Sequence, residues 1–306
     1  MEKKIIIVGA GLVGSLWAVY MRKAGYKVVI YERRSDIRKA EISAGKSINL
    51  ALSERGWNSL KTAGIKEDIE KIAIPMSGRV MHSEEGKLTY QAYGKKDEAI
   101  YSVSRGHLNA IMMDLAEKKG NSEIHYQHQC IDADLKNGKI TLKNLKTNEI
   151  FEDQADVVFA ADGAYSAIRY NSMQKVDRFN FSQFYVEDGY KELLLPAGPM
   201  GEYQIEKNAL HIWPRGRFML IALPNEGGSF TCTLFMPYEN HKYAFNDLDN
   251  DEKIDAFFKT VFPDFYNLMP NLIDNWHQNP LSSMSITRCY PWTIGKVALL
   301  GDSAHS

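Results

Sequence analysis

Two glycine motifs at opposite ends of the chain constrain its fold more than any other feature. Gly9-Ala-Gly-Leu-Val-Gly14 follows the β-branched run Lys4–Val8, and Gly301-Asp302 follows the apolar run Val297–Leu300. Each run is typical of a buried parallel strand, and each ends in a turn that can approach a phosphate or a sugar. The chain is therefore expected to return to its first domain at its far end.

The first motif also belongs to a βαβ pattern. Apolar residues recur at helical spacing over Ser15–Ala24, Gly25 ends that helix, and a second strand, Lys27–Tyr31, closes at Glu32. The glycines let the backbone approach a pyrophosphate, and a carboxylate at position 32 accepts hydrogen bonds from ribose hydroxyls. This indicates FAD or NAD rather than NADPH at the turn. The alternative is a tight packing turn followed by a solvated glutamate.

The rest of the chain changes character near residue 179. Before it, we expect strands and helices to alternate: strands at Ile48–Leu52, Arg79–Ser83, Leu88–Tyr93, Ile124–Ala133, Lys139–Leu145 and Ala155–Ala161, and helices at Glu54–Ala63 and Arg105–Lys119. After it, four alternating segments predict an antiparallel sheet: Gly189–Leu195, Ala209–Trp213, Arg217–Leu223 and Ser229–Pro237. Such a sheet can place one face on a core and the other on a ligand. A helix is expected over Asp251–Phe262.

These patterns predict an α/β chain with a Rossmann-like dinucleotide-binding domain and an antiparallel β-sheet substrate domain. The first domain is expected to comprise residues 1–75, 104–178 and 291–306, and the second residues 76–103 and 179–290. A strand followed by Gly-Asp should feed a helix, yet the sequence stops at Ser306. We therefore expect a C-terminal part to be missing.

Composition and charge exclude several classes of protein. The net charge is −1 with scattered Lys and Arg, which argues against a nucleic-acid surface, and no run of about 18 apolar residues could span a bilayer. Cys130, Cys232 and Cys289 are isolated and the histidines lack metal-ligand spacing, so no metal site is expected. A start directly in the first strand indicates a cytoplasmic, bacterial protein; a membrane anchor in the missing part stays open.

A third strand-end motif, Ala161-Asp162-Gly163, separates FAD from NAD, because two late acidic turns favour a flavin wrapped by several segments. Together with Gly9–Gly14 and Gly301–His305 it resembles the three fingerprints of the class A flavoprotein aromatic hydroxylases, which share the para-hydroxybenzoate hydroxylase fold. Within that group the chain is most similar to the kynurenine 3-monooxygenase family. The matching stretches are Gly11–Leu16, Ser47–Ser53, Asp162–Ser166, His211–Arg215, Phe218–Asn225 and Phe230–Pro237.

The resemblance implies an activity. The family binds FAD, consumes NADPH and O2, and hydroxylates L-kynurenine to 3-hydroxykynurenine through a flavin C4a-hydroperoxide, a step of tryptophan degradation. Two alternatives stay open: a hydroxylase of another anionic aromatic such as anthranilate or a phenol, and a non-catalytic flavin protein that senses redox state. No residue is assigned as a catalytic acid or base, which agrees with a chain that shows no Ser-His-Asp or Cys-His signature. A homodimer is a further expectation, which no pattern in the sequence tests.

The resemblance also implies site residues. Arg79 and Tyr93 match positions that hold the amino-acid end of kynurenine, and a guanidinium suits a carboxylate. The ring pocket is expected from Leu210, Met219, Ile221, Leu223 and Phe235, of which 219, 221 and 223 share one strand face. The cofactor residues are expected to be Gly9, Gly11, Val13, Gly14, Tyr31, Glu32, Arg33, Arg34, Ala51, Arg105, Cys130, Asp162, Gly163, Gly301 and Asp302. Without the resemblance, most of these would be ordinary surface or core residues.

Three features near the end of the chain differ from the family or carry no role from it. Ser303 and Ser306 are polar where related chains often have alanine. His305 is expected to contribute packing or a cap rather than chemistry. A Pro-Phe-Phe-Gly-Gln-Gly loop beside the flavin is expected in the segment beyond Ser306.

Overall fold

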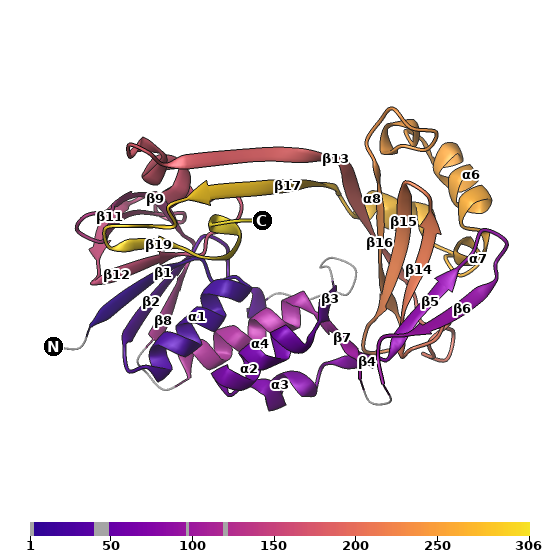
Figure 1. The fold of residues 1–306 in the computed structure, drawn as a ribbon, viewed down its shortest axis with the longest axis horizontal. Helices are drawn as coiled ribbons and strands as arrows, with labels where there is room; N and C mark the ends of the chain where they lie inside the picture. Colours follow the sequence, from indigo (N-terminus) through magenta and orange to yellow (C-terminus); the bar gives the residue numbers. More distant parts are fainter. Residues whose placement is uncertain (1–2, 40–48, 96–97, 119–121) are drawn as a thin grey trace. The chain divides into compact units, whose positions relative to one another are not determined.

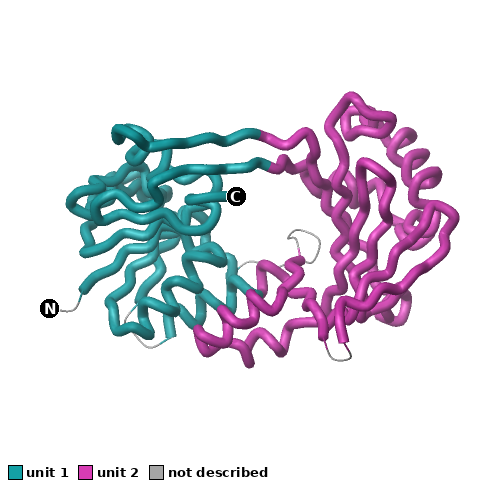
Figure 2. Tube along the Cα trace, in the orientation of Figure 1, with its two compact units in different colours: residues 1–41, 108–184, 285–306 teal, residues 42–107, 185–284 magenta. Residues whose placement is uncertain are grey.

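The computed structural model describes residues 3–39, 49–95, 98–118 and 122–306. The chain divides into two compact units (Figure 2). Unit 1 comprises residues 1–41, 108–184 and 285–306, and unit 2 comprises residues 42–107 and 185–284. Ile48 and Lys119, at the edges of two predicted elements, lie outside the described residues.

Unit 1 contains the predicted parallel sheet. Its strand order is β18-β19-β12-β1-β2-β8, with β1 at Lys4–Val8, β2 at Lys27–Glu32, β8 at Ser122–Tyr126, β12 at Val157–Ala160, β18 at Thr293–Ile294 and β19 at Val297–Leu299. β1 pairs in parallel with β12 and β2, and β12 pairs in parallel with β19. Helix α1 (Leu12–Lys23) lies against this sheet (Figure 1). β19, near the end of the given sequence, thus lies in the same sheet as β1.

A second sheet of unit 1 corrects one prediction. The stretch Ile124–Ala133 is not a single strand: it divides at Gln127, whose φ is 59°. The first part, β8, pairs with β2, whereas β9 (His128–Asp134) joins β10 (Lys139–Asn144) and β11 (Ile150–Gln154) in a three-stranded antiparallel sheet. The break carries no glycine or proline, so the apolar pattern continues across it.

The remaining elements are a small sheet, the other helices and short 3-10 turns (Figure 1). A three-stranded sheet has the order β3-β7-β4, with β3 at Asn49–Leu52, β4 at Ile74–Met76 and β7 at Ile100–Ser104. The helices are α2 (Glu54–Ala63), α3 (Lys66–Glu70), α4 (Arg105–Glu117), α5 (Ala167–Asn171), α6 (Asp251–Val261), α7 (Pro263–Tyr266) and α8 (Leu272–Gln278). Short 3-10 turns occupy Ile37–Lys39, Met173–Lys175, Phe245–Asp247 and Gly301–Ser303.

Unit 2 is built on a seven-stranded sheet of order β17-β13-β16-β15-β14-β5-β6. The strands are β5 (Gly78–His82), β6 (Leu88–Ala92), β13 (Asn180–Leu195), β14 (Ala209–Arg215), β15 (Phe218–Pro224), β16 (Phe230–Pro237) and β17 (Leu281–Tyr290). β13 begins in unit 1 and is longer than predicted, because its first half exposes aromatic residues such as Phe184 and Tyr185 as well as polar ones, which hides the alternation. The predicted antiparallel arrangement holds for β13 to β16.

The two faces of this sheet differ. Leu220 and Ala222 of β15 point into a core that includes Phe258 and Trp276 of the α6 and α8 helices. Because side chains alternate along a strand, Met219, Ile221 and Leu223 point to the opposite face. We call this second face of the sheet the open face.

A hydrogen-bonded cluster on the core side joins β5 and β14 to α7. His82 Nδ1 lies 2.8 Å from Asp264 Oδ2, and Trp213 Nε1 donates to the same oxygen at 2.8 Å. His82 Nε2 lies 2.9 Å from Nδ1 of His211, whose Nε2 lies 2.8 Å from the carbonyl oxygen of Glu206. Burial lowers the pKa of His211 to about 4. Burial raises the pKa of Asp264, but hydrogen bonds from His82 and Trp213 outweigh it, and the net pKa lies below the usual range.

Replacing Asp264 by alanine should destabilise the protein, because it leaves the ring N–H groups of Trp213 and His82 without an acceptor. Each unsatisfied buried donor costs about 1–3 kcal/mol, so we expect the free energy of unfolding to fall by about 3 kcal/mol. Urea denaturation followed by circular dichroism measures this. Asp274→Ala, an exposed residue of α8, is the control and should change stability by less than about 0.5 kcal/mol. Equal effects would show that the cluster is not stabilising.

Candidate functional site

Three strand-end turns meet at one edge of the parallel sheet of unit 1. Since β1, β12 and β19 are adjacent and parallel, their carboxyl ends lie side by side, and these ends carry Gly9, Asp162-Gly163 and Gly301-Asp302. The carboxyl edge of an open α/β sheet is where ligands bind. Turns that are far apart in the sequence therefore form one site.

Close backbone contacts fix two of these turns. Gly9 has φ of +99°, and a Cβ atom there would lie 2.5 Å from the carbonyl oxygen of Ala161, so no other residue fits. Gly301 has φ of +56°, and its Cβ would lie 2.8 Å from the side chain of Val13 in α1. The glycines thus allow β12 and the chain end to approach the first turn.

Ser303 connects the two acidic motifs directly. Its hydroxyl donates to Asp162 Oδ1 at 3.0 Å and accepts from the backbone N–H of Gly163 at 2.9 Å. The side chain is fully buried. Burial raises the pKa of Asp162 above its usual value, although hydrogen bonds from Ser166 and Ser303 oppose the rise. The serine that departs from the family's alanine therefore makes two hydrogen bonds within the site.

Arg169 donates hydrogen bonds to the backbone of the same two turns. It is fully buried, and its Nη1 donates to the carbonyl oxygen of Ser303 at 2.7 Å, while Nη2 donates to the carbonyl oxygen of Ala164. The guanidinium also lies 5.0 Å from the ring centres of Tyr170 and Phe181. Sequence reasoning missed this residue, since an arginine in a short helix carries no signal of burial.

Glu32 closes the site at the end of β2. Its Oε2 accepts the backbone N–H of Ala10 at 2.8 Å, and its Oε1 accepts Arg34 Nε at 2.9 Å and the Arg34 backbone N–H at 2.8 Å. Burial raises the pKa of Glu32, but these hydrogen bonds and the charge of Arg34 outweigh it and leave the pKa lowered. The carboxylate is therefore held ionised beside the glycine turn.

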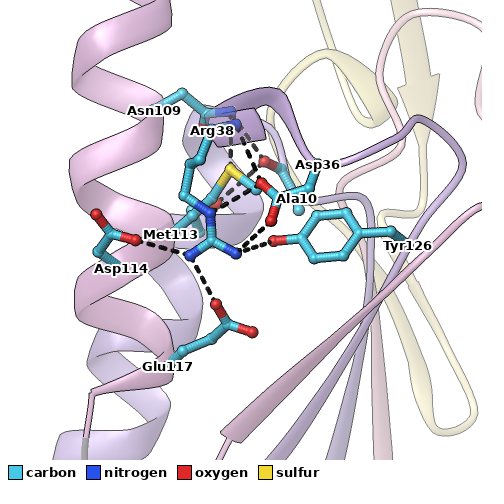
Figure 3. Close-up of polar contacts among 9 residues, drawn as sticks. Ala10, Asp36, Arg38, Asn109, Met113, Asp114, Glu117 and Tyr126 are labelled. Atoms are coloured by element: carbon cyan, nitrogen blue, oxygen red, sulfur yellow. Dashed lines mark hydrogen bonds and ion pairs between the residues drawn. The ribbon is translucent and has the colours of Figure 1, made fainter. Parts of the chain in front are cut away.

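Helix α4 anchors the loop that follows β2 (Figure 3). Arg38 donates from Nη1 to Asp114 and Glu117, both at 2.7 Å, and from Nη2 to the Tyr126 hydroxyl at 2.7 Å. Nearer the start of the helix, Asn109 Nδ2 donates to the carbonyl oxygen of Ala10 at 3.1 Å. This hydrogen bond connects α4 to the glycine turn. Figure 3 shows Arg38 between α4 and Tyr126, with Asn109 on the same helix.

The geometry of the turn fits the pyrophosphate of a dinucleotide. Gly11 is the N-cap of α1, no side chain caps it, and a Cβ there would meet open space. Val13, in the first turn of α1, is 42% exposed. The unpaired N–H groups at a helix N-terminus attract an anion. Glu32, at the end of β2, has the position from which an acidic residue binds the ribose in such folds. Gly14 lies buried in the same turn.

The other predicted cofactor residues lie in several environments. Tyr31 is buried, and its hydroxyl donates to Asp153 Oδ2 at 2.9 Å; burial raises its pKa. Cys130 packs in the core of unit 1, where burial raises its pKa. Arg33 is exposed, next to Glu32. Ala51, on β3, and Arg105, at the start of α4, belong to unit 2.

The predicted substrate residues all lie in unit 2. Arg79 of β5 is exposed, and its Nε donates to Gln91 Oε1 at 2.8 Å. Its Nη nitrogens form no hydrogen bond with the described residues. Tyr93 follows β6; burial raises its pKa, while the nearby charge of Arg79 opposes the rise. Arg79 and Tyr93 therefore lie within electrostatic range of each other.

Strand register places the predicted ring-pocket residues on the open face. Arg79 pairs with Leu210, and Met219 pairs with Phe235; directly paired residues point to the same face. The pairing of β14 with β15 sets Ile212 opposite Ile221 on that face as well. The face is thus an apolar wall with a guanidinium at one side.

Two further observations concern the described residues as a whole. None of their helices is both long and apolar enough to cross a membrane, and no group of His, Cys, Asp or Glu among them is arranged to hold a metal ion. His305 stacks on Trp292, with ring centres 5.2 Å apart, as expected for a packing role.

Comparison with known proteins gives a consistent result. The family described as FAD binding domain matches residues 2–306. Kynurenine 3-monooxygenase of Flavobacterium psychrophilum is 47% identical over 100% of this chain and 67% of its own length. The enzyme of the same name from Dictyostelium discoideum is 45% identical over 100% of this chain and 65% of its own length. The chain spans about two thirds of these relatives.

Solved structures support the fold. A 2-methyl-3-hydroxypyridine-5-carboxylic acid oxygenase superposes with a TM-score of 0.78 at 21% identity, covering 100% of this chain and 76% of the other. p-Nitrophenol 4-monooxygenase from Pseudomonas putida gives 0.74 at 18% identity, covering 100% and 73%. The predicted α/β fold is confirmed.

Ser303→Ala tests the link between the two acidic motifs. The variant removes one hydrogen bond from Asp162 Oδ1 and one from the Gly163 N–H, so we expect the free energy of unfolding to fall by about 2 kcal/mol. Ser182→Ala, at an exposed position of β13, is the matched control, with an expected change below about 0.5 kcal/mol. Chemical denaturation of both variants measures their free energies of unfolding. Equal values for the two variants would contradict a stabilising link between the acidic motifs.

Proposed function

This chain belongs to the kynurenine 3-monooxygenase family of FAD-binding proteins, and from that membership we propose that its protein hydroxylates L-kynurenine to 3-hydroxykynurenine, consuming NADPH and O2. The observation that carries the proposal is the convergence of the Gly9, Asp162 and Gly301 turns on one sheet edge. A nicotinamide-binding domain needs only the first of these turns. The two acidic turns suit a flavin held by several segments.

The residues of unit 1 would hold the cofactor. When bound, FAD supplies the redox chemistry that takes electrons from NADPH and activates O2. The open N-terminus of α1 would receive the pyrophosphate, and Glu32 would accept hydrogen bonds from the adenosine ribose. Asp302, at the end of β19, would reach the ribityl or phosphate portion from the chain end. In unit 2, Arg105 and Ala51 would lie on the flavin side, as the family resemblance implies.

The residues of unit 2 would hold the substrate. The unpaired Nη nitrogens of Arg79 match a carboxylate in a bidentate manner, and its Nε bond to Gln91 orients the guanidinium. Tyr93 would add a hydroxyl at the same end. The apolar residues Leu210, Met219, Ile221, Leu223 and Phe235 would then pack on the aromatic ring and exclude water from it.

Hydroxylation of the kynurenine ring requires that the protein position the substrate, and it requires no nucleophile from the protein. The aniline nitrogen of kynurenine already activates the neighbouring ring carbon toward an electrophilic oxygen. The protein therefore needs to fix the ring against the flavin and to keep water away. This agrees with the apolar side chains of Met219, Ile221 and Phe235 on the open face.

The direct test uses the whole protein loaded with FAD. NADPH oxidation is followed with and without L-kynurenine, and 3-hydroxykynurenine is measured by chromatography. We expect kynurenine to stimulate oxidation and the product to match the NADPH consumed. If kynurenine stimulates NADPH oxidation but hydrogen peroxide forms in place of 3-hydroxykynurenine, kynurenine is an effector and not the substrate. No stimulation would overturn the proposal.

Arg79→Ala should weaken kynurenine binding and leave FAD bound. The loss of charged hydrogen bonds to a carboxylate is worth about 1.5–3 kcal/mol, so we expect the Kd for kynurenine to rise about 10- to 100-fold. Arg79→Lys should recover only part of the affinity, since an ammonium cannot bind bidentately. Arg55→Ala, an exposed arginine of α2, is the control. Normal kynurenine affinity in Arg79→Ala would remove Arg79 from the site.

Glu32→Ala should weaken FAD retention by about tenfold or more, because it removes a charged acceptor for ribose hydroxyls. The lowered pKa of Glu32 keeps the carboxylate ionised from pH 5 to 8, so this contribution should not vary with pH there. Gel filtration with absorbance at the flavin band gives the FAD-to-protein ratio. Glu149→Ala, an exposed residue before β11, serves as the control. Wild-type retention in Glu32→Ala would refute the role.

A further inference from the structure

The open face of the unit 2 sheet carries a carboxyl group, that of Glu192, which the proposed mechanism does not use. Strand register defines three rows of neighbouring side chains on this face. The first contains the pair Arg79 and Leu210 and, further across the sheet, Leu223, Thr231 and Leu194. The second is Met81, Ile212, Ile221, Thr233 and Glu192, and the third is Pro214, Met219, Phe235 and Tyr190. Arg79 and Glu192 are the charged members of these rows. Asp188, the residue of β13 that precedes Tyr190 on the same face, is ion-paired with Arg217 at 3.0 Å.

The Glu192 carboxyl is free to accept a hydrogen bond from a ligand. It lies on β13, partly buried, beside Thr233 of β16. Among the described residues its carboxyl has no hydrogen bond and no ion pair within 4.0 Å, in contrast to Glu32 and Asp188. Burial raises its pKa, while the charge of Arg105 opposes the rise. A half-buried carboxyl without a partner is costly, which points to a ligand group that completes it.

The spacing of the two charges suits an elongated substrate. Three strands separate β5 from β13, so the backbones that carry Arg79 and Glu192 lie about 19 Å apart by strand spacing. Both residues lie on the open face, with apolar side chains of β14, β15 and β16 between them, which leaves room for a molecule with a carboxylate at one end and an aromatic ring at the other. With the carboxylate on Arg79, the ring end points toward Glu192.

The neighbourhood of Glu192 also identifies the reacting end. Arg105, whose charge acts on Glu192, starts helix α4 directly after β7, and the family resemblance places it on the flavin side. The carboxyl therefore lies on the side of unit 2 that carries Arg105. On kynurenine, the polar substituent of that ring is the aniline amino group.

We propose that Glu192 orients the substrate by accepting a hydrogen bond from the aniline N–H of kynurenine. This inference rests on the proposed function. The contact selects the ring orientation that presents the carbon next to the amino group. It also places a negative charge opposite the nitrogen, where positive charge develops as the ring accepts an electrophilic oxygen. Glu192 thereby contributes to both specificity and rate.

A purely structural role for Glu192, balancing the charge of Arg105, makes a different prediction. Loss of the carboxyl would then affect every substrate alike, because the change would act through the protein and not through the aniline group. The comparison must therefore use two ligands that differ only in that group. L-Kynurenine and 2-amino-4-oxo-4-phenylbutanoate, which lacks the ring amino group, are such a pair.

The experiment measures Kd for both ligands by titrating the flavin absorbance of the FAD-loaded protein, together with kcat and KM for kynurenine. In the wild-type protein we expect kynurenine to bind more tightly than the analogue. Glu192→Met should reduce this preference about tenfold and lower kcat, with the Kd of the analogue unchanged. Glu192→Gln, which keeps a neutral acceptor, should fall between. Glu187→Gln, an exposed residue of the same strand, should match the wild type.

The pH profile gives an independent readout. In the wild type, kcat/KM for kynurenine should decline on the acid side as Glu192 becomes protonated, at a pH above that of an ordinary glutamate because its pKa is raised. That decline should be absent in Glu192→Met. An unchanged ligand preference in Glu192→Met, or an equal loss for both ligands, overturns this inference while wild-type turnover leaves the proposed function standing. Failure of the wild type to bind kynurenine overturns both.

Discussion

The approach of the first glycine turn to strand β12 is the contact on which the cofactor site depends. With Gly9 against the carbonyl of Ala161, the end of β1 lies close enough to β12 for Asp162 to share one sheet edge with the glycine turn. β19 then adds Gly301 beside Val13. A Cβ at either glycine would push these strand ends apart, so the site exists only because the backbone can pack this closely.

In unit 2, the alternation of side chains along each strand gives the sheet two different faces. The same strands must fill a core on one side and present a substrate surface on the other. Large apolar side chains such as Leu220 and Phe230 serve the core, and the intervening positions, such as Ile221 and Thr231, form the open face. A shift of register by one residue would exchange the two faces. The core of α6 to α8 therefore also fixes which side chains a substrate can meet.

The sequence predicts the fold where local pattern and topology agree. The β1-turn-α1-β2 unit, the helix Glu54–Ala63 and the parallel return of β19 follow from β-branched runs, glycines and spacing. It fails where a polar residue takes an unusual conformation: Gln127 has a positive φ and splits a predicted strand. The individual site contacts of Ser303 could not be predicted either, since its two partners are more than 130 residues away. The roles of Arg79 and Tyr93 rest on resemblance, because nothing in an exposed strand residue indicates a ligand.

Arg169 shows why such positions escape a motif search. Its guanidinium is fully buried, yet its partners are backbone carbonyl oxygens and two aromatic rings, not a carboxylate. A buried cation without an anionic partner is costly, unless several dipoles point at it. The turn after β12 and the 3-10 turn after β19 both end in carbonyl groups aimed inward, so one planar fork with several donors can satisfy both. A lysine offers no such fork. The arrangement makes the two acidic motifs a single rigid element, and Asp162 keeps its position because the backbone on each side of it is held.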